Sequence, residues 1–326
     1  MTRTLKDLAQ HLNLSEMTVS RALHSPKNVS PETRERVLAA AAAMNYQPNL
    51  TARSLKTGRT NIVSVWVPDV SSSMFGKVVE GIREQAYAAQ VGLMIGQTHH
   101  NLWAKSSEGV LAQWPVDGIF AYDQAELVEH ALTSPHPPRT PIISMGGDYC
   151  ELGDYVGIDI YAGASEAMRH LLAERRRIAL LAPHYFLRTG YSHYDAYMAA
   201  MRHAGLPPEV VSLPEDSREA ACRVITAYGF ERGWPEAVFC TNDEIAIGAL
   251  QAARDWGMRV SDDFAIIGSD GILETEYQWP PLSTVEFPIA QMCAAAWQFF
   301  QVRQAHPDHP PQQVVLSTTL HLRASS

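Results

Sequence analysis

The first 45 residues carry apolar side chains at the spacing of short amphipathic helices. In a first predicted helix these side chains recur at positions i, i+3, i+4 and i+7, namely at Leu5, Leu8, Ala9 and Leu12. Asn13 follows and favours a left-handed stop. Ser15 can cap a second helix that ends near His24. The side chains of this helix that we expect to face inward are Val19, Ala22 and Leu23.

A third helix is predicted to begin after Ser30, because Pro31 follows it in the arrangement of a cap and a first helical residue. The apolar positions of this helix are Val37, Leu38, Ala41 and Met44. Two short helices joined by a tight turn and braced by a third form the helix-turn-helix arrangement. In that arrangement the second helix enters the major groove of DNA with its N-terminus first.

The outward side chains of the second helix suit contacts with bases. Arg21 can make a bidentate contact to guanine, Glu16 can accept a hydrogen bond from cytosine, and Met17 can touch a thymine methyl group. The alternative is a three-helix protein-interaction module with a solvated, charged face. Periodicity alone gives the two interpretations similar weight.

Residues 45–61 favour a DNA-binding head over a protein-interaction module. Pro48 ends the third helix, and residues 50–55 can form one or two helical turns. A helix this short is marginal in water, so we expect it to fold only when docked. Leu55 lies beside two cationic side chains and suits a wedge pushed between base steps in the minor groove. The alternative is a flexible linker with one stray leucine.

From Asn61 onward, short β-branched apolar runs alternate with helical stretches. The runs lie at 62–68, 91–97, 118–122, 141–145, 178–182, 236–240 and 264–268. This alternation predicts βαβ units and parallel sheets that are buried on both faces. Ligands of such sheets lie beyond the carboxyl ends of the strands.

Polar or aromatic residues follow most of these runs. They are Asp69, Phe75, Asp123, His184, Tyr185, Asn242, Asp243 and Asp270. Carboxylates and amides bind pairs of hydroxyl groups, and aromatic rings cover C–H faces, so the set suits a polyhydroxy ligand. The alternative is that several of these residues only cap the next helix, which is the role we expect for Asp243.

Length and composition restrict the class of protein. A chain of 326 residues predicts two or three domains. Its 46% hydrophobic and 19% charged residues are typical of a globular protein. No segment resembles an export signal or a membrane span, so we expect a cytoplasmic protein without a membrane partner. The four scattered cysteines are expected to be reduced thiols in or near the core.

The net charge of −9 argues, taken alone, against a nucleic-acid partner. The distribution of charge changes that conclusion. Residues 1–60 contain nine basic and four acidic residues, a net charge of +5, so residues 61–326 carry −14. A small basic head on a large acidic body suggests a binding head.

The first 61 residues resemble, in order and without gaps, the headpiece and hinge of LacI/GalR-type transcription repressors. The most specific pieces are TVSR at 18–21, VSPETRERV at 29–37, NYQPN at 45–49 and ARSLKTG at 52–58. The resemblance implies base readout by Glu16, Met17 and Arg21. It implies minor-groove readout by Ala52 and Arg53, with Leu55 as the intercalating wedge. The phosphate contacts that it implies are Ser15, Thr18, Asn28, Ser30, Thr33, Tyr46 and Asn49.

The resemblance extends more loosely over the rest of the chain, through VPDVSSSMF at 67–75, FCTNDEIAIGAL at 239–250 and FAIIGSD at 264–270. It implies an effector-binding core similar to periplasmic sugar-binding proteins. With the strand-end placements, the predicted effector contacts are Phe75, Asp123, His184, His193, Asn242 and Asp270. Two positions depart from the family, which often has Arg where His193 lies and Asp where Gly146 lies. A histidine can still bind a hydroxyl group or, when protonated, a sugar acid.

The predicted fold class is therefore α/β. An all-α helix-turn-helix headpiece with a hinge helix occupies residues 1–60, followed by two doubly wound parallel-sheet subdomains around a cleft. The resemblance implies three crossovers, near 158, 288 and 312. The first subdomain is then 61–158 plus 288–312, and the second is 159–287 plus 313–326.

The predicted function is a ligand-responsive repressor that binds a palindromic DNA operator as a homodimer. The dimer is expected because the chain stops at LHLRASS, without the leucine heptads through which the family forms tetramers. The expected effector is a carbohydrate first, a sugar acid second and a purine third. The residues do not predict whether the effector releases or promotes operator binding.

Two other classes compete with this function. A stand-alone sugar-binding module is disfavoured by the head and by the lack of an export signal. An enzyme is disfavoured because the chain contains no GxxxxGK[ST], HExxH or GxSxG motif. His306, Asp308 and His309 in HPDHP suggest a surface loop more than a metal site, since two further ligands at diagnostic spacing are missing. We therefore expect no metal and no cofactor.

Overall fold

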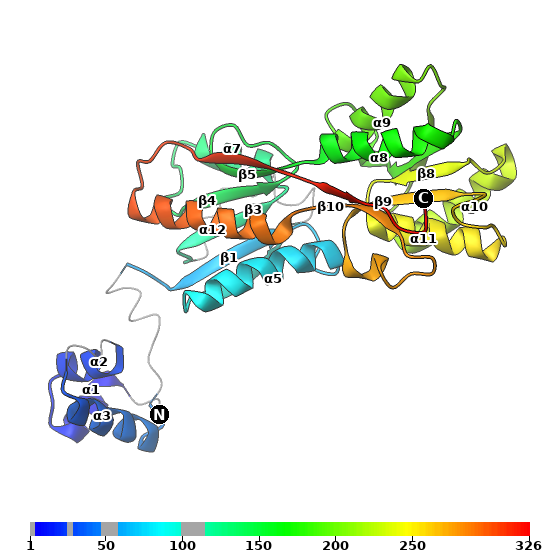
Figure 1. The fold of residues 1–326 in the computed structure, drawn as a ribbon. Coiled ribbons are helices and arrows are strands. Elements are labelled where there is room, and N and C mark those ends of the chain that lie inside the picture. The colour runs from blue at the N-terminus through cyan, green and yellow to red at the C-terminus, as the bar shows by residue number, and fades with distance from the viewer. Residues whose placement is uncertain (1–3, 25–28, 47–57, 99–114) are drawn as a thin grey trace. The chain divides into compact units, whose positions relative to one another are not determined.

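A computed structural model describes residues 4–24, 29–46, 58–98 and 115–326, and the chain divides into two compact units at Asn61 and Ile62. The first unit contains three helices, α1 (Leu5–Leu12), α2 (Glu16–His24) and α3 (Pro31–Ala43) (Figure 1). Their buried side chains form one small core, made of Leu8, Ala9, Val19, Ala22, Val37, Ala40 and Ala41. Among the described residues, no helix is long and apolar enough to cross a membrane.

Local chemistry sets the ends of these helices as predicted. Asn13 ends α1 in the left-handed conformation, with a φ of 52°. The Ser15 hydroxyl accepts a hydrogen bond of 3.1 Å from the Thr18 N–H, and the Ser30 hydroxyl accepts one of 3.2 Å from the Thr33 N–H. One core prediction is wrong, because Leu38 is exposed and Ala40 is buried in its place. Leu38 lies one residue past the buried stripe of α3, and one residue turns a helix by about 100°.

The second unit is built from two six-stranded sheets, each flanked by helices (Figure 1). The first sheet has the strand order β11-β5-β4-β3-β1-β2 and is parallel throughout. Its strands are β1 (Ile62–Val67), β2 (Gly92–Gln97), β3 (Gly118–Tyr122), β4 (Ile142–Gly146), β5 (Asp154–Asp159) and β11 (Gln313–Ser317). The helices of this first half are α5 (Ser73–Ala88), α7 (Ala125–Leu132) and α12 (Ile289–Ala305).

The second sheet has the order β12-β10-β9-β8-β6-β7, and only its edge strand β12 is antiparallel. Its strands are β6 (Ile178–Pro183), β7 (Glu209–Leu213), β8 (Ala237–Cys240), β9 (Ala265–Asp270), β10 (Ser283–Glu286) and β12 (Thr319–His321). The helices of this second half are α8 (Ile160–Glu174), α9 (Ser192–His203), α10 (Arg218–Arg232) and α11 (Asp243–Asp255). Two 3-10 turns belong to it, η2 (His184–Phe186) and η3 (Leu273–Thr275).

Three connections join the halves, from β5 to α8, from β10 to α12 and from β11 to β12 (Figure 1). The third lies later than the sequence predicted. Strand β11 pairs with β5 from Gln313 to Ser317, so those five residues belong to the first half and the chain crosses at Thr318 instead of near 312. The apolar pattern did not show this because β11 is an edge strand with alternating exposure.

The helix α12 packs into the core of the first half. The ring of Trp297 stacks on that of Phe120, with ring centroids 5.6 Å apart, and Phe300 contacts Phe120 edge-on. Gly81 lets α5 approach α12 closely, because a Cβ atom at this position would lie 2.6 Å from the Cys293 sulfur. All four cysteines are free thiols, and three of them are buried.

Candidate effector cleft and DNA-contacting surface

A cavity of about 810 Å³ lies between the two halves of the second unit. Its walls are formed by residues at or just beyond the carboxyl ends of strands β1, β3, β4, β6, β7, β8, β9 and β10, together with the starts of α5 and α9. The carboxyl ends of parallel strands from both sheets therefore meet at one cavity, which is where an open α/β sheet binds its ligand. Its volume is that of a typical small-molecule site.

Five of the six predicted effector residues line this cavity, namely Phe75, Asp123, His193, Asn242 and Asp270. His184 does not line it and is exposed. Strand β6 ends at Pro183, and the 3-10 turn that follows directs Tyr185 and Phe186 into the cavity instead. The strand end was located correctly, but the turn decides which side chain faces inward.

Phe75 forms an apolar part of the wall. Its ring meets the ring of Tyr122 edge-on, with centroids 5.7 Å apart. Tyr122 is the last residue of β3 and is almost fully buried, so it holds Phe75 from behind. An aromatic face next to carboxylates can cover the C–H face of a ligand while the carboxylates bind its polar groups.

Asp123 is held in the left-handed conformation, with a φ of 49°. Its Oδ1 accepts a hydrogen bond of 2.8 Å from the Gly147 N–H. Burial, reinforced by the charge of Asp148, raises the pKa of the Asp123 carboxyl to about 8. Gly146 must lack a side chain because its φ is 111° and a Cβ atom there would lie 2.1 Å from the Asp123 carboxylate. The missing carboxylate at position 146 is therefore a consequence of Asp123.

Asp270 ends β9 with a φ of 115°, which a residue with a side chain rarely adopts. Backbone strain of this kind gathers at functional sites. Only 9% of Asp270 is exposed, and burial together with the charge of Asp243 raises the pKa of its carboxyl well above the ordinary range. Its position and environment agree with the predicted role as an effector contact.

Asn242, and not Asp243, takes the capping role that the sequence suggested for Asp243. Asn242 is the cap of α11, because its Oδ1 accepts a hydrogen bond of 2.8 Å from the Ile245 N–H. Its Nδ2 donates to Asp216 at 2.7 Å, so it also lies in the cleft wall. Asp243 is the first residue of α11, fully buried, and accepts hydrogen bonds from the Ile272 N–H and the Thr284 hydroxyl. The capping role expected for Asp243 is therefore wrong.

His193 lies at the start of α9, and its Nε2 is 3.0 Å from the Ser269 hydroxyl. Burial lowers the pKa of His193 to about 4. The ring is therefore neutral at neutral pH and can exchange hydrogen bonds with a hydroxyl group. Its use as a cation for a sugar acid, which the sequence left open, does not fit this environment.

Among the polar residues of the cleft that sequence reasoning missed are Asp148, Asp216 and Thr241. Thr241 directly follows β8 and carried the signal of a strand end. Asp216 lies three residues beyond β7, a strand that alternates in exposure and gives no continuous apolar run. Asp148 lies two residues beyond Gly146 and partly replaces the carboxylate missing there.

Two hydrogen bonds connect the halves beside the cavity. The Ser73 hydroxyl donates to Glu274 at 2.9 Å, and the Lys77 ammonium donates to the Gly271 carbonyl at 2.6 Å. Both donors belong to α5 in the first half, and both acceptors follow Asp270 in the second. A change in the angle between the halves would break or strain them.

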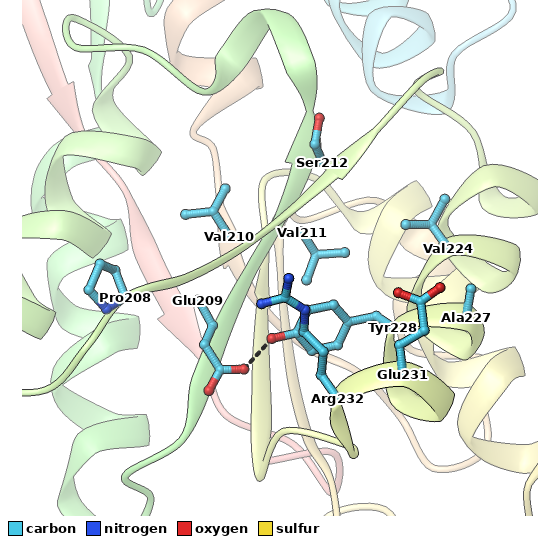
Figure 2. A pocket seen from close by; sticks show the side chains of 10 residues that line it. All are labelled: Pro208, Glu209, Val210, Val211, Ser212, Val224, Ala227, Tyr228, Glu231 and Arg232. Atoms are coloured by element: carbon cyan, nitrogen blue, oxygen red, sulfur yellow. Dashed lines mark hydrogen bonds between the residues drawn. The ribbon is translucent and has the colours of Figure 1, made fainter.

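Figure 2 shows a second cavity, of about 530 Å³, between the edge strand β7 and helix α10. Glu209 lies at the start of β7, and it accepts hydrogen bonds from the Tyr228 hydroxyl and from the Arg177 Nε. This cavity runs along a single edge strand, from Pro208 to Ser212, and the Glu209 carboxylate already has partners. The cleft between the halves is the stronger candidate for the effector site.

The first unit presents its predicted base-reading side chains to solvent. Glu16, Met17 and Arg21 on α2 are all exposed. Ser15 and Thr18 hold the start of α2, and Ser30 and Thr33 hold the start of α3, where N–H groups can bind phosphate. Tyr46 packs against the core, and partial burial raises the pKa of its hydroxyl. Five predicted DNA contacts lie outside the described residues, namely Asn28, Asn49, Ala52, Arg53 and Leu55.

Comparison with known families matches both units. Residues 4–49 match the family described as bacterial regulatory proteins, lacI family. Residues 168–326 match the periplasmic binding protein-like domain.

Whole-chain relatives agree with these matches. The chain is 29% identical to the HTH-type transcriptional regulator DegA of Bacillus subtilis (strain 168), with 100% of this chain and 98% of that protein covered. It is 28% identical to the HTH-type transcriptional repressor PurR of Mannheimia succiniciproducens, with 99% and 98% covered.

The fold is that of solved regulators. The crystal structure of the Lac repressor dimer bound to operator and an anti-inducer matches with a TM-score of 0.85, at 21% identity, covering 100% of this chain and 99% of that one. The complex of the transcriptional regulator CelR with cellobiose matches with a TM-score of 0.69, at 23% identity, covering 99% and 100%.

Proposed function

The chain belongs to the LacI family of bacterial regulatory proteins, and we propose that it is a transcriptional repressor whose affinity for a DNA operator is controlled by a small effector. The observation that carries the proposal is the exposed row Glu16, Met17 and Arg21 on a helix whose back is buried in a three-helix core. Such a helix can enter the major groove while the rest of the head rests on phosphates.

Different residues of the head supply the affinity for DNA and the selectivity for its sequence. The hydroxyl groups at the starts of α2 and α3, with Tyr46, Asn28 and Asn49, contact phosphates and supply most of the affinity. The α2 side chains read base edges, and Ala52, Arg53 and Leu55 read the minor groove. Residues 1–60 thus act as the headpiece and hinge.

We propose that the protein acts as a homodimer, so that two heads read a near-palindromic operator. Three large apolar side chains are exposed close together in the sequence of the second half: Leu273, Tyr277 and Trp279. Arg254 at the end of α11 binds the Trp279 carbonyl and holds this segment against the second half. A self-complementary apolar surface is the usual basis of a two-fold interface.

The effector occupies the cleft between the two subdomains, which we assign to 61–158 plus 288–317 and to 159–287 plus 318–326. A carbohydrate fits best, because carboxylates, an amide and a neutral histidine surround an aromatic wall. The acidic lining disfavours a sugar acid, and a purine is the remaining alternative. The cleft binds without turnover, and the protein works in the cytoplasm.

Binding-site selection on random DNA with the full-length protein tests the function. We expect a near-palindromic site, bound with an affinity that falls steeply with salt because phosphate contacts dominate. Arg21→Ala should weaken binding by about 1–3 kcal/mol and relax the preference at one base pair of each half-site. Recovery of no preferred sequence would favour the stand-alone sugar-binding module.

A second arm tests the effector site. Asp270→Ala should abolish the response of operator binding to the effector while the operator affinity itself is retained. A normal response in this variant would remove Asp270 from the site.

A further inference from the structure

The walls of the effector cleft carry far more negative than positive charge. Seven acidic side chains line it: Asp69, Asp123, Asp148, Asp216, Glu219, Glu244 and Asp270. Among the described lining residues the only lysine or arginine is Arg218. The contrast exceeds the general acidity of residues 61–326, which contain 31 acidic and 17 basic residues. The acidic residues come from separate strand ends in both halves and meet at one cavity.

The cationic groups near the cleft are already engaged. Arg218 forms a two-point ion pair with Glu244, with its Nη2 3.0 Å from Oε1. Lys77 donates to the Gly271 carbonyl and does not line the cavity. His193 is neutral at neutral pH, since burial lowers its pKa to about 4. These three groups leave Asp123, Asp216 and Asp270 without a cation beside them, and burial raises the pKa of each of these carboxyls.

One polar group of the cleft wall lacks the partner that burial demands. The Thr241 side chain is 4% exposed, and its hydroxyl makes no hydrogen bond with any described group. Asp270 is 9% exposed, and its carboxylate accepts a backbone hydrogen bond from Asp243. A buried polar group without a partner costs free energy unless a ligand or water supplies one. Thr241 therefore points to a ligand with hydrogen-bonding groups.

We propose that the effector is a polyhydroxylated amine, such as an amino sugar, whose ammonium group lies among Asp123, Asp216 and Asp270. The proposal rests on the function assigned above and names the ligand class of the same cleft. The carboxylates come from both halves of the unit, so one ammonium can draw on groups from each side. Hydroxyl groups of the same ligand reach Asn242, His193 and Thr241, and Phe75 covers the carbon skeleton.

The acidic lining should distinguish three classes of ligand by their charge: carboxylates, neutral polyols and amines. A carboxylate ligand would meet like charges, and a neutral polyol would leave Asp123 and Asp270 with raised pKa values. An ammonium favours the ionised form of these carboxyls. An ammonium gains attraction that is stronger inside a partly desolvated cleft than in water. It also provides three N–H donors, which suit an acceptor-rich wall.

Binding of an ammonium should release protons. The carboxyl of Asp123, whose pKa is raised to about 8, is mostly protonated at neutral pH and would ionise beside the ligand, giving its proton to the buffer. Besides the seven acidic side chains, the titratable and charged groups around it are Tyr122, Tyr185, Tyr191, His193 and Arg218 in the walls, with Asp243 and Lys77 behind them. Over pH 6 to 8 the affinity for the amine should therefore rise.

The test compares matched ligands on the full-length protein by isothermal titration calorimetry. One series is glucamine, sorbitol and gluconate, which share a carbon chain and differ in an amine, a hydroxyl or a carboxylate at one end. The other is the 2-amino hexoses, their parent hexoses and their N-acetyl derivatives. We expect at least one amine to bind about tenfold or more tightly than its neutral partner, with an advantage that shrinks as salt rises. Titration in two buffers of different ionisation enthalpy should show proton release.

Variants that replace a carboxyl group with an amide show which residues produce the preference for the amine. Asp270→Asn and Asp123→Asn should each reduce the preference for the amine over its hydroxyl partner by about tenfold while preserving side-chain shape. Glu231→Gln, which removes an equal charge in the second cavity at the other end of α10, is the matched control and should retain the preference. Thermal melting of each variant establishes that it is folded.

Three results would overturn the proposal: equal binding of amine and neutral partner, tighter binding of the carboxylate, or no binding by any amine. Operator selection needs no effector and is measured separately. A protein that selects an operator but shows no preference for amines would retain the proposed function and lose this inference. Failure to select any operator would instead count against the proposed function itself.

Discussion

The ammonium group of Lys77 donates a hydrogen bond of 2.6 Å to the carbonyl oxygen of Gly271. Lys77 lies on α5 of the first half, and Gly271 directly follows Asp270 of the second. The contact therefore connects α5 of the first half to the residue next to Asp270, which we expect to bind the effector. It is a place where ligand binding can be converted into a change of angle between the halves.

Lys77→Met should weaken the coupling between effector binding and operator affinity. A hydrogen bond made in only one arrangement of the halves adds about 0.5–1.5 kcal/mol to the free energy that separates them. Its loss should reduce the ratio of operator affinities without and with effector by about 2–10-fold, as measured by fluorescence anisotropy. Arg83→Met removes a cation from the same helix that pairs only at the surface with Glu80, and it should leave the ratio unchanged. An unaltered ratio in Lys77→Met would exclude the contact from the allosteric change.

Leu55→Ala should weaken operator binding by about tenfold or more, corresponding to about 1.4 kcal/mol. The reason is the loss of an apolar wedge between base steps, which the ARSLKTG segment suggests. Leu38→Ala applies the same truncation to an exposed leucine of α3 and serves as control. Both variants should bind effector normally. An operator affinity equal to that of the unaltered protein would refute the wedge.

Arg303→Met should destabilise the second unit by about 3–5 kcal/mol, because it leaves a buried carboxylate without its cation. Asp154 is almost fully buried, and its two oxygens accept hydrogen bonds of 2.8 and 2.9 Å from the Arg303 guanidinium. Urea unfolding measures the loss. Arg259→Met breaks only exposed ion pairs and should change little. Comparable unfolding midpoints for the two variants would contradict the buried pair.

Asp123→Asn should stabilise the protein at pH 8 and not at pH 4. The folded protein raises the pKa of this carboxyl to about 8, so between about pH 4 and pH 8 the folded state holds a proton that the unfolded state has released, and stability falls as pH rises. The amide avoids that loss and keeps an acceptor for the Gly147 N–H. We expect a gain of about 1–3 kcal/mol at pH 8, measured by thermal melting across pH. A gain that does not change with pH would rule out titration of Asp123 as its cause.

Local patterns predicted the head closely. The starts of all three helices and the ends of α1 and α2 lie within about two residues of the expected positions, because caps such as Ser15 and Ser30 and the stop at Asn13 act within a few residues. Helix α3 ends at Ala43, earlier than the limit expected from Pro48. Seven strands were also evident, since each lies in an apolar run. Five strands were not. Among these, β7 and β11 lie at or near sheet edges and alternate in exposure, and β5 is buried although its sequence, DYVGID, contains no continuous apolar run.

The cleft was predicted in part for the same reason. Strand ends placed Phe75, Asp123 and Asp270 correctly, because parallel strands bring their carboxyl ends to one edge. His184 was wrong because the turn after β6 directs the next two side chains inward, and no periodicity encodes that turn. Asp216 was missed because it lies in the loop between β7 and α10.

Taken alone, the sequence determined the division into a basic head and an acidic α/β body, the elements of each, and most of the strand-end residues. These depend on spacing, capping and charge counts, which are local or additive. Only the tertiary structure decided that carboxylates from both halves share one cavity, that His193 is neutral there, and that Asn242 rather than Asp243 caps α11. Such properties arise from burial and from contacts between residues far apart in the chain, and they appear only when the sheets are brought together.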